Sequence, residues 1–243
     1  MTLSHFDLSA ALTTVQQVSG QLSSDEQCSE ALTAMGKAIS QRQDDILEAN
    51  TLDLEISRDM AVPELVVDWL KLTPERVQTA ADILHRLAAM GTAEPRLITN
   101  GSYPPSRPVG TVGFIYEAFP DLGAIAAGLC IRTGNALVLR GGSEASRTNQ
   151  IIASILQSAL TEVGLSADLM LSVEPTDVSR IELAQSAEIN LIIAHGRPSL
   201  VEQVVESASV PAIPSRMGNC YLYSSSSCIV DQVCKMIVCS HAG

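Results

Sequence analysis

The chain is poor in aromatic and in basic residues. Phe, Trp and Tyr make up 3% of the 243 residues, so a core has to be built from Leu, Ile, Val and Ala. Asp and Glu number 27 against 15 Lys and Arg, which gives a formal net charge of −12. Because nucleic acid and anionic membrane surfaces attract basic faces, this acidic balance argues against both as partners.

Long apolar runs and secretory features are also lacking. The most apolar stretch, residues 122–139, is interrupted by Arg132, Thr133, Gly134 and Asn135, whereas a membrane span needs roughly 20 apolar residues. The N-terminus has neither the basic segment nor the continuous apolar segment of a secretory signal. We therefore expect a cytoplasmic protein.

The six cysteines show no metal-binding spacing. Four of them, Cys220, Cys228, Cys234 and Cys239, crowd the C-terminal end, but no C-x-x-C pair occurs and only His241 lies nearby. A zinc site needs closely paired ligands. We therefore interpret the cysteines as reduced, buried thiols and expect no metal.

Residues 1–107 carry helical patterns. An apolar stripe runs from Leu8 to Val18. Asp25 opens a second helix whose apolar positions continue through Leu47. Further starts lie at Pro63 and at Thr73-Pro74-Glu75, where Thr is the cap and Pro the first helical residue, and Gly91 is a plausible stop. Between residues 97 and 108 the chain is polar and rich in proline.

After Pro108 the pattern changes to strands and helices in alternation. Apolar runs predict strands near 109–116, 136–140, 169–174, 189–194 and 210–213, a short one at 221–224, and helices over 122–131 and 144–163. Strands that are apolar throughout suit a parallel sheet covered on both faces. We predict an α/β fold in which a helical region (1–107) precedes a Rossmann-like sheet with flanking helices (108–243), the two packing as one unit.

The turn Arg140-Gly141-Gly142-Ser143 joins a strand to a helix. In a parallel sheet this edge binds ligands, and free helix N–H groups favour phosphate. Glycines let the backbone approach a ligand, and the arginine fork suits a 2′-phosphate, which favours NADPH over NADH. The alternative is a simple glycine turn, since the sequence of this turn does not match the dinucleotide-binding pattern G-x-G-x-x-G.

Four stretches resemble γ-glutamyl phosphate reductase (glutamate-5-semialdehyde dehydrogenase), a branch of the aldehyde dehydrogenase superfamily. Residues 109–121 are similar to V-I-G-x-I-Y-E-A-R-P-N, and residues 130–149 to C-x-K-T-G-N-A-x-x-L-R-G-G-x-E-A-x-x-x-N. Residues 46–55 and 68–77 are similar to I-L-x-A-N-x-x-D and D-R-L-x-L-T-x-x-R. The resemblance implies NADPH-dependent reduction of γ-glutamyl phosphate to glutamate-5-semialdehyde in proline biosynthesis.

The chain departs from this family at turns that would face ligands. On the substrate side, which includes Glu117, Phe119 stands for Arg and Asp121 for Asn. Phe119 cannot bind an anion, and Asp121 would repel one. The turn His195-Gly196-Arg197 is similar to the family's R-G-G, with Arg197 for the second glycine. His195 and Arg197 could offer cationic donors to the cofactor; the alternative is that they are ordinary turn residues.

The family's catalytic cysteine lies in an R-P-S-V-C-N-A stretch that does not occur in these 243 residues, so no catalytic residue is assigned. Cys220, in a region similar to V-P-V-I-x-x-x-x-G-x-C-H-x-Y, is interpreted as a structural thiol, with Tyr221 in place of His. Two hypotheses follow. The chain is part of a reductase acting on a small-molecule substrate, or it is a non-catalytic NADP-binding module or degenerate paralogue. A homo-oligomer stays open.

Overall fold

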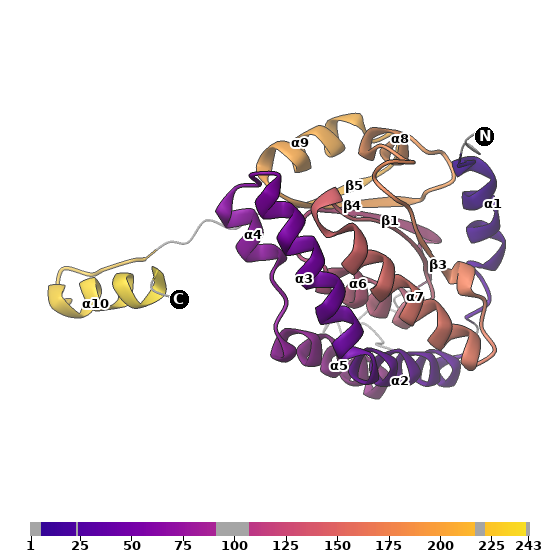
Figure 1. Ribbon diagram of the computed structural model, residues 1–243, viewed down its shortest axis with the longest axis horizontal. Helices are drawn as coiled ribbons and strands as arrows, with labels where there is room; N and C mark the ends of the chain where they lie inside the picture. Colours follow the sequence, from indigo (N-terminus) through magenta and orange to yellow (C-terminus); the bar gives the residue numbers. More distant parts are fainter. Residues whose placement is uncertain (1–5, 23, 91–106, 217–221, 242–243) are drawn as a thin grey trace, which may run out of the picture.

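The computed structural model describes residues 6–22, 24–90, 107–216 and 222–241, and a parallel sheet lies at its centre (Figure 1). The strands are β1 (Thr111–Tyr116), β2 (Ala136–Arg140), β3 (Met170–Ser172), β4 (Leu191–Gly196) and β5 (Ala212–Arg216). Their order is β3-β2-β1-β4-β5. The chain leaves β1 first toward β2 and β3 and later returns to its other side, so the direction of winding reverses between β1 and β4, as in doubly wound nucleotide-binding sheets.

One face of the sheet is covered by two layers of helices. Helices α6 (Asp121–Arg132) and α7 (Ser146–Glu162) pack with α2 (Asp25–Gln41) and α5 (Pro74–Ala89) in one hydrophobic cluster. The large buried side chains of this cluster include Leu32, Met35, Leu84, Ile131 and Leu137. The aliphatic core expected from the low aromatic content is therefore confirmed on this face.

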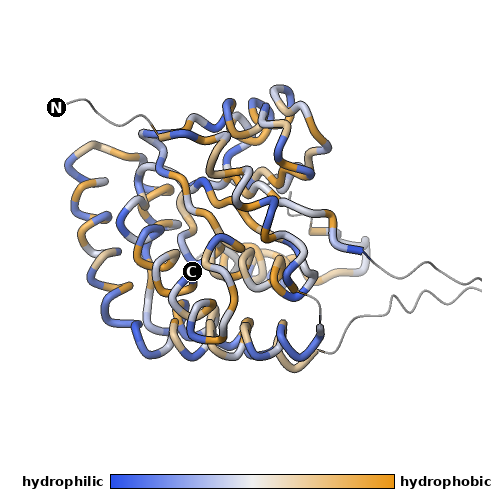
Figure 2. Tube along the Cα trace, turned by 90° about the vertical axis from the view of Figure 1, so that its right-hand side faces the viewer, coloured by the Kyte–Doolittle hydropathy of each residue, from blue (hydrophilic) through white to orange (hydrophobic). Residues whose placement is uncertain are grey.

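The opposite face is covered by α1 (Leu8–Val18), α8 (Arg180–Ala184) and α9 (Pro198–Ser207). Leu12 of α1 and Val201 of α9 share a buried cluster with Ile115 and Val138 of the sheet. Hydrophobic and hydrophilic residues alternate along the helices in Figure 2, as expected when one helix face meets the core. Helices from the first hundred residues thus contribute to the packing on both faces.

The prediction of one helix from Asp25 through Leu47 is wrong. Arg42 has φ −103° and ψ 21°, so α2 ends at Gln41 and α3 (Gln43–Asp59) begins directly after it. Ile39 and Ile46 lie in the same buried cluster on either side of this break. The break therefore lets both helices turn their apolar sides to one core.

The predicted helix starts near Pro63 and Thr73 are confirmed. Pro63 is the N-cap of α4 (Glu64–Leu70), one residue before the helix. Pro74 is the first residue of α5, and the Thr73 hydroxyl accepts a hydrogen bond from the Arg76 amide at 3.3 Å. Gly91 lies outside the described residues.

Three differences from prediction are larger than two residues or concern the type of element. Residues 143–145 form a 3₁₀ turn, η1 (Ser143–Ala145), before α7 begins at Ser146. Strand β5 runs to Arg216 and contains Pro214, which an edge strand tolerates; among the described residues β5 pairs on one side only, with β4. Residues 222–224 are not a strand, and residue 221 lies outside the described residues. Leu222 and Tyr223 lack the buried pattern of a central strand, since both are exposed.

The last described helix, α10 (Val230–His241), stands apart from the rest of the structure in Figure 1. Cys228 and Cys234 are exposed, so their interpretation as buried thiols is wrong, whereas Cys28 and Cys130 are buried. None of the described cysteines forms a disulfide. Among the described helices, none is long and apolar enough to cross a membrane.

Candidate functional site

The carboxyl edge of the sheet brings together the residues singled out in the sequence. Tyr116 of β1 pairs with His195 of β4, and Ile115 pairs with Arg140 of β2. The turns that follow these three strands therefore lie side by side, with the reversal of winding between β1 and β4. Ligands of open α/β sheets bind at such a point.

An ion pair spans the reversal. Glu117 follows β1 and is 4% exposed, and its carboxylate accepts hydrogen bonds from the Arg197 backbone amide and from Nε and Nη2 of the same residue, Nη2 at 2.9 Å. Hydrogen bonding to Glu117 and its charge raise the pKa of Arg197. Gly196 has φ +146°, and a Cβ there would lie 2.7 Å from Glu117 Cγ. A glycine is therefore required at position 196 for Glu117 to bond to Arg197 in this way.

Arg140 faces the protein's own main chain. The residue is 6% exposed, and its guanidinium donates to the carbonyls of Val178 at 3.3 Å and Gly141 at 3.0 Å. Burial, followed by the nearby charge of Arg180, lowers the pKa of Arg140. Its binding of an anionic group stays a prediction, and such a ligand would have to share the guanidinium with two carbonyls.

The two glycines make room for side chains of the chain itself. A Cβ on Gly141 would overlap the Asn149 amide, and a Cβ on Gly142 would overlap the Glu144 carboxylate. Glu144 in turn accepts a hydrogen bond at 2.7 Å from the backbone amide of Ala118, which has φ +62°. The space beside the two glycines is therefore occupied by side chains of the chain itself, and Ser143 is the exposed residue of the turn.

The N-terminus of α7 carries a carboxylate that sequence reasoning missed. Asp53 of α3 is 4% exposed and accepts hydrogen bonds from the Thr148 amide at 2.8 Å, the Thr148 hydroxyl at 2.7 Å and the Arg147 amide at 3.3 Å. Free N–H groups at a helix start attract anions, and here an internal anion satisfies two of them. A phosphate at this helix start would have to displace Asp53.

Phe119 lies in an aromatic cluster that also was not predicted. Its ring stacks on Trp69 of α4, with ring centroids 5.3 Å apart, and meets the His195 ring edge-on at 5.7 Å. The Arg76 guanidinium lies 5.9 Å from the Phe119 centroid. Trp69, Phe119 and His195 are all half-buried, so the cluster is accessible at the edge of the sheet.

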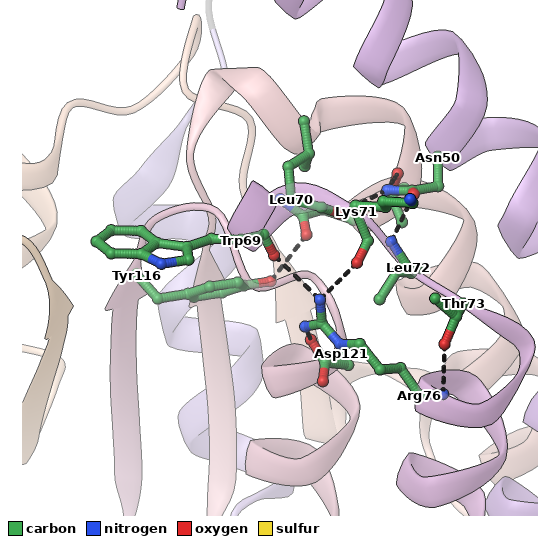
Figure 3. A network of polar contacts seen from close by, with 11 residues as sticks. Asn50, Trp69, Leu70, Lys71, Leu72, Thr73, Arg76, Tyr116 and Asp121 are labelled. Atoms are coloured by element: carbon green, nitrogen blue, oxygen red, sulfur yellow. Dashed lines mark hydrogen bonds and ion pairs between the residues drawn. The ribbon is translucent and has the colours of Figure 1, made fainter. Parts of the chain in front are cut away.

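Asp121 is paired, which changes the prediction that it would repel an anion. Nη2 of Arg76 forms an ion pair with the Asp121 carboxylate, and Nη1 donates to the carbonyls of Trp69 at 3.2 Å and Lys71 at 2.6 Å (Figure 3). The negative charge of Asp121 is therefore compensated locally. Arg76 is correspondingly committed to bonds within the protein.

Asn50 fixes the connection that carries Trp69. Its side chain donates to the Leu70 carbonyl at 3.0 Å and accepts from the Leu72 amide at 2.8 Å, as Figure 3 shows. A buried amide that bonds main-chain groups two residues apart holds the short segment between α4 and α5 in one conformation. Trp69 and Arg76, which flank this segment, are thereby held against the sheet edge.

The edge carries further polar and aromatic groups on both sides of the reversal. His195 Nδ1 lies 2.9 Å from the Ser215 hydroxyl, and burial lowers the pKa of His195 against the opposing effect of Glu117. The His195–Ser215 pair, the faces of the Trp69 and Phe119 rings and the exposed Ser143 thus provide apolar and hydrogen-bonding surfaces on both sides of the reversal. Among the described residues no group of three or more potential ligands is arranged to hold a metal ion.

Comparison with solved structures defines the class. γ-Glutamyl phosphate reductase from Thermotoga maritima superposes with a TM-score of 0.82 over 96% of this chain and 59% of that one, at 24% identity. Glyceraldehyde-3-phosphate dehydrogenase from Methanocaldococcus jannaschii, complexed with NADP, gives 0.68 over 87% and 46%, at 20% identity. The fold is that of part of an aldehyde dehydrogenase-like enzyme.

Sequence comparison narrows this class. γ-Glutamyl phosphate reductase 2 of Synechocystis is 39% identical over 224 residues, which cover 88% of this chain and 53% of the relative. The Gloeobacter violaceus γ-glutamyl phosphate reductase is 33% identical over 217 residues, covering 86% and 52%. The chain is a homologue of γ-glutamyl phosphate reductases and spans about half the length of the curated relatives it matches. No family model matches it.

Proposed function

We propose that the chain is the nicotinamide-cofactor-binding part of a cytoplasmic reductase that forms glutamate-5-semialdehyde from γ-glutamyl phosphate in proline biosynthesis. The observation that carries this proposal is the 39% identity to a γ-glutamyl phosphate reductase over 88% of the chain. The reversal of winding between β1 and β4 supports it, because this is where such sheets bind nucleotides.

The cofactor proposed is NADPH, which supplies hydride when bound. Ser143, His195 and Arg197 are accessible at the carboxyl edge and are proposed to contact it. Arg140, Gly141, Gly142 and Gly196 are proposed to act mainly by shaping the two turns, because their surroundings are filled by the chain's own groups. Glu117, Phe119 and Asp121 remain the proposed substrate side.

A non-catalytic NADP-binding module is the second candidate. One observation favours it: Arg197 stands where the resembling family has glycine, and its side chain is tied to Glu117 across the reversal. A glycine there would leave this space to a ligand. Both candidates require cofactor binding and differ in turnover.

Calorimetric titration of the purified chain with NADPH and NADH tests the shared requirement. We expect saturable binding that is tighter for NADPH and that is weakened by Arg140→Ala. The control is Arg132→Ala, which removes a mostly buried arginine of α6 whose ion pair is with Asp25. No binding at millimolar cofactor would contradict the proposal. Reduction of NADP by the chain with glutamate-5-semialdehyde would favour the reductase. Cofactor binding without turnover would favour the non-catalytic module.

A further inference from the structure

The Trp69–Phe119 stack lies at the reversal of winding. Phe119 follows β1 and touches His195 at the end of β4 across the reversal, whereas Ser143 follows β2, one strand farther from it. A dinucleotide that straddles the reversal places one nucleotide over each half. With the adenosine half proposed beside Ser143, the nicotinamide half reaches the reversal, where the stack meets His195.

The two stacked positions differ from the family pattern in the same way. Trp69 occupies the Arg position of D-R-L-x-L-T-x-x-R, and Phe119 the Arg position of Y-E-A-R-P-N. In this chain the two side chains are in contact, with centroids 5.3 Å apart and planes 23° from parallel. Two cationic positions have thus been replaced together by one continuous aromatic surface.

The charges next to this surface are satisfied within the protein. Arg76 pairs with Asp121 and bonds two carbonyls, and the Glu117 carboxylate is held by Arg197. The accessible groups around Phe119 are ring faces and ring edges, together with the partly exposed side chains of Arg76 and Arg197, whose charges are paired. Such a surface binds flat rings by stacking, which is worth about 1–3 kcal/mol per ring where bases stack on aromatic side chains.

We propose that the Trp69–Phe119 stack, with His195 edge-on to it, is the platform against which the nicotinamide ring of the cofactor stacks. This rests on the proposed function, since it assigns residues to the same cofactor. Phe119 and Trp69 are thereby specificity-determining residues for a flat, uncharged ring rather than for an anionic group.

The test compares two ligands that differ by the nicotinamide half. NADPH and adenosine 2′,5′-bisphosphate are titrated calorimetrically into the 243-residue chain and into Phe119→Leu. We expect the variant to weaken NADPH binding by about five-fold or more and to leave adenosine 2′,5′-bisphosphate within about two-fold. Trp69→Leu provides a second variant with the same expected pattern.

Phe114→Leu is the matched control. Phe114 also stacks on a neighbouring ring, Tyr116, at 4.8 Å, but it is buried in the core, so its loss is expected to lower stability without changing either affinity. If Phe119→Leu and Trp69→Leu weaken both ligands equally or neither, the platform is refuted while cofactor binding stands. If neither ligand binds the unaltered chain, the proposed function fails and the platform with it.

Discussion

Replacing Asp53 by alanine should destabilise the fold strongly, because one buried carboxylate caps α7 from α3. Its three hydrogen bonds go to the Arg147 amide, the Thr148 amide and the Thr148 hydroxyl. Removing a capping side chain costs typically about 1 kcal/mol, and buried donors left without a partner add about 1–3 kcal/mol. We therefore expect Asp53→Ala to lower the free energy of unfolding by about 3 kcal/mol.

Asp53→Asn should cost less. An amide oxygen can still accept from the Thr148 groups, and what is lost is the attraction between a negative charge and the positive end of α7. That attraction is worth about 0.3–1 kcal/mol at exposed sites and up to about 2 kcal/mol at partly buried ones. We expect a loss of about 1 kcal/mol for Asp53→Asn, which separates the charge from the hydrogen bonds.

The assay is urea unfolding followed by helical circular dichroism and by the fluorescence of Trp69, the one tryptophan of the chain. Coincident transitions would justify a two-state free energy. Glu55→Ala, an exposed change in the same helix, is the control and should stay within about 0.5 kcal/mol of the unaltered protein. Thr148→Val completes a double-mutant cycle with an expected coupling to Asp53 of about 1 kcal/mol or more.

The capping role of Asp53 is refuted if Asp53→Ala behaves like Glu55→Ala, or if the cycle shows no coupling between Asp53 and Thr148. The first result would mean that water or another group satisfies the start of α7. The second would mean that the loss arises elsewhere in α3. In either case, Asp53 would not be the group that stabilises the start of α7.

Three further outcomes are expected. Gly196→Ala should cost about 2 kcal/mol or more in chemical denaturation, because of its φ of +146° and the overlap with Glu117; an unchanged midpoint would contradict this. Burial raises the pKa of the Cys130 thiol to about 12, so at pH 8 a maleimide should modify Cys234 long before Cys130 in peptide mapping of the native protein. Burial lowers the pKa of His195, so the unfolded chain binds its proton more tightly and stability should fall as pH drops below about 6.5, a dependence that His195→Gln should reduce.

Local patterns in the sequence were sufficient for most elements of the fold. The apolar runs predicted β1, β2 and β4 to within two residues. For β1 and β2 the reason is that a strand buried on both faces leaves a continuous apolar signature, whereas β4 is buried on one face and half-buried on the other. The cap at Thr73 was predictable because its partner, the Arg76 amide, lies three residues away. The break at Arg42 was not, because Ile39 and Ile46 continue the same apolar pattern across it.

The place of the candidate turn in the fold was predictable, but its contacts were not. The Gly141-Gly142 turn lies at the carboxyl edge of the sheet, as the sequence predicts, yet the groups that fill it, Asn149 and Glu144, are fixed by tertiary packing. From the sequence, Asp53 could be recognised only as the residue that matches the Asp of the family pattern I-L-x-A-N-x-x-D. Its role as a cap could not be predicted, because its partner Thr148 is 95 residues away. Nothing local in the sequence indicates that Trp69 stacks on Phe119.

The departures from the family pattern bear on whether the chain is a degraded remnant. Two of them, Asp121 and Arg197, introduce charges at the sheet edge, and each is paired with a residue that matches the pattern, Arg76 and Glu117 respectively. Without selection, nothing favours a partner for a new charge. Compensated charges beside a stacked aromatic pair are what an edge maintained with an altered surface would show, so they support the proposal of retained ligand binding over that of decay.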